Sequence, residues 1–426
     1  MNFNSISRLN GEIILPGDKS ISHRSVMFSS ISNGKNYIKN FLMGQDCLST
    51  IDCFRKMGVN IDIWKNKDVI VNGVGLRGLK KPDNVLDVGN SGTTIRLIMG
   101  ILSGQNFKST LVGDESISKR PMKRVTEPLK EMGAKIDGLE NGNFAPITIE
   151  GGNLKGINYK MPIASAQVKS AIILASLYSN SSSKIIEKSK SRNHTEIMLK
   201  SFGADINVDG LEIDVNPVDS LYPQEIYVPG DISSAAFFIA GASIIKGSEV
   251  LIKNVGLNPT RTGILDVLKD MGGNFEILNK EVICGEEIGD ILVKYSNLNG
   301  VTIYGDLIPK LIDEIPIIAV MATQAEGQTI IKDAKELKVK ESNRIKSVVE
   351  NLKKMGADIE ELEDGMVING PTKLKGANIE SFNDHRIAMA FSIASLISYG
   401  NTYIKNFNCV NISFPSFCDI LKRISY

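Results

Sequence analysis

The sequence predicts an α/β protein with α+β character, built from about six copies of one supersecondary unit. Two series of small residues carry this prediction, together with long apolar helices that recur between them. The first series lies between an apolar helical run and a β-like run, and its members are Gly34, Gly104, Asn180, Gly247, Gly327 and Gly400. The second series closes amphipathic helices and consists of Gly58, Gly133, Gly203, Gly272 and Gly356. Members of the first series are spaced 67 to 80 residues apart, which indicates a repeated unit.

Each copy is expected to contain an apolar helix, a glycine turn, a strand, an amphipathic helix, a second glycine turn and one or two strands. Apolar helices are expected at residues 94–102, 168–177, 233–245, 315–324 and 387–398, each long enough to be buried. The second-series glycines are expected at the C′ position, where a left-handed residue ends a helix. The units are long and variable and show no capping end, which argues against an open solenoid.

The composition excludes several classes of protein. Hydrophobic residues make up 42% and charged residues 23% of the 426 residues, so wholesale disorder is excluded. Lysine plus arginine is 49 and aspartate plus glutamate is 48, so no overall basic charge can bind nucleic acid, although a local basic cleft stays open. No apolar run reaches the roughly 18 to 20 residues of a spanning helix, and no signal peptide is recognised. We expect a cytoplasmic protein with neither a nucleic-acid nor a membrane partner.

The sequence lacks the usual cysteine, histidine and glycine motifs of metal-binding and nucleotide-binding sites. The five cysteines form no CxxC pair and the three histidines form no HxxxH pair, so free thiols and no metal site are expected. No P-loop motif occurs, and the one GxGxxG, at residues 73–78, leads into a proline-containing segment rather than a helix. We therefore expect no cofactor held by these motifs.

Three predicted helix starts, at residues 16–24, 88–96 and 161–169, combine small residues with a basic residue near the first turn. Helix N-termini expose unpaired N–H groups and a partial positive charge, so they can accept phosphate or carboxylate. Ordinary N-capping by Ser, Thr and Asn is the alternative. The residues alone leave both interpretations open.

Basic turns at residues 114–124, 339–344 and 383–386 are candidates for clamping an anion, with a solvated surface cluster as the alternative. Asp313 and Glu314, ahead of an apolar helix, are candidates for acid–base chemistry, or they complement the helix dipole. Together these segments favour electrostatic clamping of a polyanionic substrate with carboxylate acid–base chemistry.

Taken in order, the motifs resemble the enolpyruvyl transferase family, and within it the members that act on shikimate 3-phosphate. Each motif is weak alone, whereas their ordered set is specific and covers essentially the whole chain. The matching segments are Leu15–Arg24, Gly89–Arg96, Gly113–Met122, Ser165–Ser170, Pro229–Ser234, Lys340–Arg344 and Asn383–Arg386.

The resemblance implies a two-domain inside-out α/β barrel of six βαβαββ repeats, three per domain. It implies a discontinuous C-terminal domain, residues 1–17 plus 231–426, an N-terminal domain, residues 18–230, and an active site in the cleft between them. It further implies transfer of the enolpyruvyl group of phosphoenolpyruvate to the 5-hydroxyl of shikimate 3-phosphate, with release of phosphate, in the pathway to chorismate and the aromatic amino acids. A monomer without metal or cofactor is implied, with two small-molecule substrates.

The resemblance also implies roles for individual residues. Asp313 would take the 5-hydroxyl proton, Glu341 would protonate the methylene carbon, and Lys19 would assist proton transfer. Shikimate 3-phosphate would be bound by Lys19, Ser20, Arg24, Ser165, Ala166, Gln167, Asp313 and Lys340. Phosphoenolpyruvate would be bound by Lys19, Asn90, Gly92, Arg120, Gln167, Arg344 and Arg386. Supporting roles are implied for His385, Asp384, Ser191 and His194.

The sequence departs from the family pattern in two places. Members often carry a lysine before a Ser/Thr-Phe-Pro motif, where this chain has Ile412, and His194 replaces a tyrosine of some members. The resemblance implies that the inhibitor glyphosate would bind near Gly92, and we expect that binding to be sterically allowed. Two alternatives stay open: transfer of enolpyruvate to UDP-N-acetylglucosamine, whose enzymes usually carry a cysteine in the loop corresponding to residues 113–120, and a non-enzymatic repeat protein. That loop contains no cysteine here.

Overall fold

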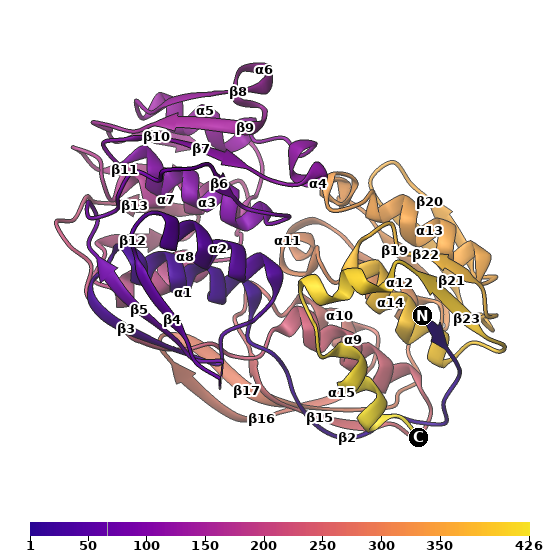
Figure 1. Cartoon of the computed structure of the whole chain (residues 1–426). Helices are drawn as coiled ribbons and strands as arrows, with labels where there is room; N and C mark the ends of the chain where they lie inside the picture. The colour runs from indigo at the N-terminus through magenta and orange to yellow at the C-terminus, as the bar shows by residue number, and fades with distance from the viewer. Residues whose placement is uncertain (66) are drawn as a thin grey trace. The chain divides into compact units, whose positions relative to one another are not determined.

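The computed structural model describes residues 1–65 and 67–426, which divide into two compact units. The N-terminal unit comprises Gly17–Val228 with Ile283–Glu286. The C-terminal unit comprises Met1–Pro16, Pro229–Val282 and Glu287–Tyr426. Each unit has its own apolar core, as the clusters of buried side chains indicate. Figure 1 labels their helices and strands.

The described strands of the N-terminal unit form four-stranded sheets. The first has the order β14 (Glu225–Tyr227), β3 (Asn33–Lys39), β5 (Val69–Val74), β4 (Asn60–Ile63). The second has the order β6 (Leu86–Asp87), β7 (Lys108–Val112), β9 (Phe144–Glu150), β8 (Lys135–Gly138). The third has the order β10 (Asn158–Lys160), β11 (Ser183–Ile186), β13 (Glu212–Val215), β12 (Ile206–Asp209).

The C-terminal unit contains three comparable sheets within the described residues. One has the order β2 (Asn10–Ile14), β15 (Glu249–Gly256), β17 (Glu286–Lys294), β16 (Asn274–Ile283). Another has the order β18 (Thr302–Ile303), β19 (Gly327–Ile331), β21 (Met366–Gly370), β20 (Asp358–Glu361). The last has three strands, in the order β1 (Asn2–Phe3), β23 (Thr402–Lys405), β22 (Asn378–Glu380).

The sheets share one pairing pattern, which confirms the repeat predicted from the glycine markers. In the first sheet β3 is parallel to β14 and antiparallel to β5, which is antiparallel to β4. The same sequence of pairings recurs through β18, β19, β21 and β20. Within the described residues each sheet pairs only its own three or four strands, so the repeats form separate sheets and the strands do not join into one closed barrel.

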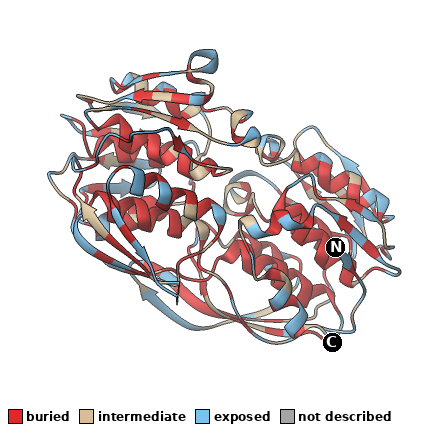
Figure 2. Ribbon diagram, viewed as in Figure 1, coloured by how far each residue is buried: buried red, intermediate tan, exposed pale blue. Residues whose placement is uncertain are grey.

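The helices are of two kinds: apolar helices, which we call inner helices, and amphipathic helices. Figure 2 shows the inner helices almost entirely buried. The inner helices are α1 (Lys19–Ile31), α3 (Gly92–Ser103), α7 (Ala166–Ser176), α9 (Ile232–Ile244), α12 (Ile315–Ala322) and α14 (His385–Leu396). Every residue of α9, α12 and α14 is buried. The amphipathic helices are α2 (Gln45–Lys56), α5 (Lys123–Glu131), α8 (His194–Ser201), α10 (Gly263–Asp270), α13 (Arg344–Lys354) and α15 (Phe417–Ile424). The apolar helices predicted from the sequence are thus confirmed.

Short helical turns complete the elements: α4 (Glu115–Ser118), α6 (Leu139–Gly142), α11 (Ile308–Leu311), and the 3₁₀ turns Gly305–Leu307, Lys335–Val339 and Phe407–Ile412. Among the described residues, none of the helices combines the length and the apolar character that crossing a membrane requires.

The second-series glycines end the amphipathic helices as the sequence predicts. Each directly follows the C-cap residue and has a positive φ, for example 84° at Gly58 and 85° at Gly356. The next amide then closes the helix end, as Ala357 N donates to Leu352 O at 3.0 Å. This bond satisfies a carbonyl that the helix leaves unpaired, and glycine tolerates the left-handed backbone that it requires.

Candidate active site

The first turn of α1 places a lysine beside an acidic residue of α2. Asp18 caps the helix, because its Oδ1 accepts from Ile21 N at 2.8 Å. Lys19 therefore begins the helix, and its Nζ lies 3.3 Å from Asp46 Oδ2. Both side chains are mostly shielded from solvent, at 19% and 10% exposed. Asp46 holds Lys19 in one orientation, and no sequence motif pointed to this partner.

Arg24, one turn further along α1, is buried within the N-terminal unit. Its Nε donates to Thr195 Oγ1 at 2.7 Å, and its Nη2 donates to Ser170 Oγ at 3.0 Å. Its Nη1 donates to Ser20 O at 3.0 Å. The structure thus brings together the predicted residues Ser20 and Arg24, and the bonds that it describes for the guanidinium lead to neutral oxygens.

The start of α3 gathers a second group of predicted residues. Ser91 caps the helix, accepting from Thr94 N at 3.1 Å, so Asn90 directly precedes the cap and Gly92 is the first residue of the first turn. A Cβ added to Gly92 would lie 2.9 Å from Arg96 Nη1 and 3.1 Å from Arg120 Nη1. Two guanidinium groups therefore converge on the positive end of a helix, an arrangement suited to an anion.

The guanidinium of Arg120 makes few hydrogen bonds within the described residues, so it can bind an anionic ligand. Its side chain is buried, and Nη2 donates to Asn90 Oδ1 at 3.3 Å and to Ser116 Oγ at 3.0 Å. Its Nε has no hydrogen-bond partner in the part of the chain that the structure describes. A buried polar atom without a partner is costly, and an anionic ligand would satisfy it.

The start of α7 lies beside the start of α3. Ser165 caps α7, accepting from Val168 N at 3.4 Å, so Ala166 and Gln167 form its first turn. Gln167 Oε1 accepts from Arg96 Nη1 at 2.8 Å, and Gln167 Nε2 donates to Thr93 Oγ1 at 3.2 Å. The predicted residues of both helix starts therefore form one group. Arg96 also belongs to this group, although the sequence analysis assigned it no role. Its position four residues after Gly92, on the same helix face, was the available signal.

The caps of these helices differ in charge. Ser91 and Ser165 are neutral, whereas Asp231 and Asp384 cap α9 and α14 in the C-terminal unit. A carboxylate at a cap already offsets the partial positive charge of the helix end. The ends of α3 and α7 keep that charge, which favours binding of an anion there.

Ser191 and His194 contact carboxylates inside the N-terminal unit. Ser191 N and Oγ both donate to Glu187 Oε1, the former at 3.1 Å. Lys169 Nζ lies 3.0 Å from the other oxygen of Glu187. His194 Nδ1 is 2.7 Å from Glu286 Oε1, and both side chains are buried. Ser191 and His194 are therefore both held by buried carboxylates.

A second cluster, in the C-terminal unit, is centred on Arg344, whose side chain is 1% exposed. Its Nε lies 2.8 Å from Asp384 Oδ2, its Nη2 lies 2.6 Å from Glu341 Oε2, and its Nη1 lies 3.1 Å from Asp313 Oδ1. Burial alone would lower the pKa of Arg344, but the charges of Asp384, Glu341 and Asp313 outweigh it and raise the pKa. Arg344 is thus a permanent cation that holds three carboxylates around it.

Asp313 contacts the remaining predicted cations of this unit. Its Oδ1 lies 3.6 Å from Lys340 Nζ and 3.8 Å from Arg386 Nε. Arg386 Nη1 also donates to Asp313 O at 3.3 Å. The structure therefore brings five residues that the sequence analysis assigned to the site into one group: Asp313, Lys340, Glu341, Arg344 and Arg386.

Asp384 links this cluster to the start of α14. Its Oδ1 accepts from Arg386 N at 2.9 Å, while its Oδ2 accepts from Ser342 Oγ at 3.1 Å. His385 follows it as a buried residue. Ile412, where the resemblance led us to expect a lysine, packs partly buried against the core of this unit.

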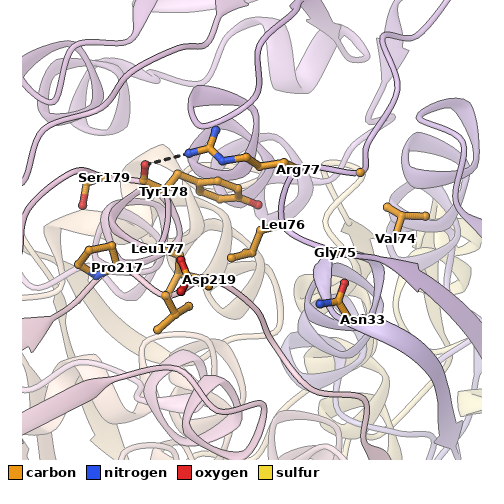
Figure 3. Close-up of a pocket in the computed structure, with 12 residues that line it drawn as sticks. Asn33, Val74, Gly75, Leu76, Arg77, Leu177, Tyr178, Ser179, Pro217 and Asp219 are labelled. Carbon is orange, nitrogen blue, oxygen red and sulfur yellow. Dashed lines mark hydrogen bonds between the residues drawn. The ribbon is translucent and has the colours of Figure 1, made fainter.

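A pocket of about 630 Å³ in the N-terminal unit lies away from every predicted site residue (Figure 3). It is lined by the ends of helices and strands, including Arg77, Tyr178 and Asp219. Arg77 Nη1 donates to Gly104 O at 3.2 Å and Nη2 donates to Tyr178 O at 3.4 Å. Because its guanidinium is bonded to two carbonyls at helix ends, Arg77 has a structural role there.

Within residues 1–65 and 67–426, no group of three or more His, Cys, Asp or Glu side chains is arranged to hold a metal ion. The carboxylates of the second cluster surround Arg344 instead.

The fold is one that a known enolpyruvyl transferase shares. The enolpyruvyl transferase NikO from Streptomyces tendae shares the fold, with a TM-score of 0.80 over 99% of this chain and 96% of that one, at 14% identity. At higher identity, the EPSP synthase of Acinetobacter baumannii matches with a TM-score of 0.89 and 44% identity, over 99% of this chain and 97% of that one.

The family model described as EPSP synthase (3-phosphoshikimate 1-carboxyvinyltransferase) matches residues 3–421, so the chain belongs to this family of transferases. Two curated relatives carry the name 3-phosphoshikimate 1-carboxyvinyltransferase. The one from Bacillus pumilus is 56% identical over 98% of this chain and 97% of its own length. The one from Thermoanaerobacter sp. is 59% identical over 96% of each chain.

Proposed function

We propose that the chain transfers the enolpyruvyl group of phosphoenolpyruvate to the 5-hydroxyl of shikimate 3-phosphate and releases phosphate. The observation that carries the proposal is the pair of clusters. The guanidinium groups of Arg96 and Arg120 converge at the start of α3, beside the start of α7, and carboxylates gather around Arg344. Both substrates are polyanions, so their charges must be neutralised before they can approach each other. The names of the relatives support the same reaction.

The first cluster suits the binding of anions. Arg120 and the first-turn amides of α3 would hold phosphoenolpyruvate, with Asn90 and Gly92 beside them. The first turn of α7, Ser165–Gln167, would hold the 3-phosphate of the second substrate. Lys19, Ser20 and Arg24 would contact both substrates from α1. We propose that the residues of the two clusters act on the same pair of substrates.

The second cluster supplies the acid and the base. Glu341 would donate a proton to the methylene carbon of phosphoenolpyruvate, while Asp313 would accept the proton of the 5-hydroxyl. The hydroxyl oxygen forms a bond to the central carbon, which gives a tetrahedral intermediate. Loss of a proton from the new methyl group then accompanies breakage of the carbon–oxygen bond to phosphate, which restores the double bond. Protons are thus exchanged with two carboxylates at each stage.

The cations of this cluster are bonded to its carboxylates. Asp313 Oδ1 contacts Lys340, Arg344 and Arg386 within 4 Å. Phosphate and carboxylate groups of the substrates would compete for Lys340 and Arg386. Asp313 would then share fewer contacts with these cations, and its carboxylate would be available to the 5-hydroxyl.

One assay tests the reaction directly. Phosphate release should require both phosphoenolpyruvate and shikimate 3-phosphate. Release with UDP-N-acetylglucosamine in place of shikimate 3-phosphate would overturn the proposal, and so would the absence of any turnover. Glyphosate should compete with phosphoenolpyruvate, since the lack of a side chain on Gly92 lets the guanidinium groups of Arg96 and Arg120 lie close to the start of α3, where both anions would bind.

The acid–base roles have a separate test. We expect Glu341→Gln and Asp313→Ala to lower kcat by about 100- to 10,000-fold, with KM values changed much less. Glu363→Gln is a suitable control, because Glu363 is 85% exposed and pairs only loosely with Lys335. An equal loss of binding and turnover in the first two variants would contradict the assigned roles.

We also propose that the protein works as a cytoplasmic monomer with domains at residues 1–17 plus 231–426 and 18–230. Sedimentation analysis tests the oligomeric state, cell fractionation tests the compartment, and limited proteolysis tests the domain bounds.

A further inference from the structure

A chain of four buried side chains connects three helices in the N-terminal unit. His23 in α1, Thr50 in α2, and Ser91 and Thr94 at the start of α3 are all 0% exposed. His23 Nδ1 lies 2.7 Å from Thr50 Oγ1, and Thr50 Oγ1 lies 2.7 Å from Thr94 Oγ1. Thr94 Oγ1 donates to Ser91 Oγ at 2.7 Å. Four polar groups are thus bonded in series where water cannot compete.

Both ends of the chain meet residues that the proposed function uses. Ser91 lies between Asn90 and Gly92, and its side chain caps α3. His23 directly precedes Arg24, and it follows Lys19 by four residues, which places the two on one face of α1. The chain therefore connects residues of α1 that would contact both substrates to the turn that would bind phosphoenolpyruvate.

The protons can be assigned consistently along the chain. Thr94 Oγ–H donates to Ser91, so Thr94 Oγ1 accepts from Thr50, and Thr50 Oγ1 accepts from His23 Nδ1–H. His23 is then a neutral ring that donates once. Burial, and next the charges of Lys19 and Arg24, lower its pKa well below 6.5, which agrees with a neutral ring. The network therefore adds no charge to the site, and its effect is geometric.

Geometry matters at this turn because the surrounding space is tight. The position of a Cβ on Gly92 lies only 2.9 Å from Arg96 and 3.1 Å from Arg120. Arg120 also donates to Asn90 Oδ1 at the long distance of 3.3 Å. A small displacement of this turn would change the distance between the helix start and both guanidinium groups.

We infer that His23, Thr50 and Thr94 are positioning residues, which hold Ser91 and thereby fix the Asn90–Gly92 turn for binding phosphoenolpyruvate. The inference rests on the proposed function, in which that turn binds this substrate. The three residues touch neither substrate in this scheme.

The decisive variant is Thr50→Val, which removes one hydroxyl and keeps the shape of the side chain. Thr94 and His23 then each lose a buried partner. We expect the KM for phosphoenolpyruvate to rise about tenfold, the effect of one lost buried hydrogen bond. The KM for shikimate 3-phosphate should change by less than about twofold, and Thr50→Ser should restore the wild-type values.

A matched control exists in the same unit. Thr110 in β7 and Thr148 in β9 form another hydroxyl pair, at 3.1 Å, in a sheet. Thr110→Val should leave both KM values unchanged. If Thr50→Val does not fold, the pair His23→Leu and His23→Asn replaces it, because asparagine keeps a polar group near the position of Nδ1 and leucine does not. His23→Leu should raise the KM for phosphoenolpyruvate and His23→Asn should not.

The outcomes separate this inference from the proposed function. Wild-type protein without turnover contradicts the proposed function and removes the basis of the inference. Active wild-type protein whose Thr50→Val variant keeps its KM for phosphoenolpyruvate overturns the inference alone. Equal increases in both KM values, or no rescue by Thr50→Ser, would also overturn it, since they indicate a general structural role.

Discussion

At the scale of single residues, Gly92 shows how the absence of a side chain can serve a site. We expect Gly92→Ala to push aside Arg96 Nη1 and Arg120 Nη1, which lie 2.9 and 3.1 Å from the new Cβ. Both are far ends of flexible side chains, so they can shift and stability should change little. Binding should suffer instead, with the KM for phosphoenolpyruvate raised about tenfold or more. Steady-state kinetics and a thermal melt measure the two effects.

Gly152→Ala provides the control, because nothing lies within 4 Å of a Cβ at that position. Its KM values should match those of the wild type. A Gly92→Ala variant with an unchanged KM for phosphoenolpyruvate would contradict the placement of this substrate at the start of α3.

His23 makes a prediction about pH. Burial, followed by the charges of Lys19 and Arg24, lowers the pKa of His23 well below the 6.5 of an ordinary histidine, while Asp18 raises it slightly. In the unfolded chain His23 therefore becomes protonated near pH 6.5, whereas in the folded chain it stays neutral at that pH. Folding stability should fall as the pH drops below about 6.5, and it should be fully present above that value.

His23→Asn removes this contribution. Urea unfolding between about pH 5 and pH 7.5 should show a smaller loss of stability in the variant than in the wild type. Parallel curves for the two proteins would contradict the lowered pKa, because they would show that His23 binds its proton equally well in the folded and unfolded chains.

The residue types of the site could be predicted, but many of their partners could not. Arginines beside helix starts and acidic residues beside basic turns are visible in the sequence. The pairing of Lys19 with Asp46, or of Arg24 with Thr195, depends on how separate helices pack. Neither Asp46 nor Thr195 belongs to a pattern that local spacing could reveal. The partners of buried charges are therefore fixed by tertiary structure.

At the scale of elements, the glycine turns were the most predictable feature because their cause is local. A helix end that needs a left-handed residue selects glycine at that position. Sheet partners were less predictable: β14 lies beside β3 through the pair Glu225 and Tyr37, which are far apart in sequence. Local periodicity cannot show which distant strand completes a sheet.

A substitution of Gly272 tests whether glycine is needed for the left-handed backbone at a helix end. Its φ is 81°, and the nearest atom to an added Cβ, Asn299 Nδ2, is 3.5 Å away, so substitution introduces backbone strain without a clash. We expect Gly272→Ala to cost about 1 kcal/mol of unfolding free energy, with kinetics unchanged. Denaturant unfolding measures the change against Gly152→Ala. Equal stabilities for the two variants would contradict the role of Gly272 as a helix terminator.

At the scale of the whole molecule, each unit is stabilised by its own core. The C-terminal unit is discontinuous in sequence, because it includes the first residues of the chain. β1 and β2, at the start of the chain, complete sheets with β23 and β15 from the C-terminal unit. Leu9, Ile13 and Leu15 belong to the core of that unit. The first residues of the chain should therefore stabilise the C-terminal unit.

Ile13→Ala tests this division. Ile13 is 0% exposed and pairs with Ile252 between β2 and β15, so its truncation should cost about 2–4 kcal/mol. Amide hydrogen exchange should accelerate in β15 and the other elements of the C-terminal unit, and stay slow in the N-terminal unit. Ile38→Ala is the reciprocal variant, because Ile38 is also 0% exposed and pairs with Ile226 between β3 and β14. It should accelerate exchange in the N-terminal unit alone. If either variant accelerates exchange in both units equally, the two cores unfold as one cooperative structure, and the separation of their buried clusters has no energetic counterpart.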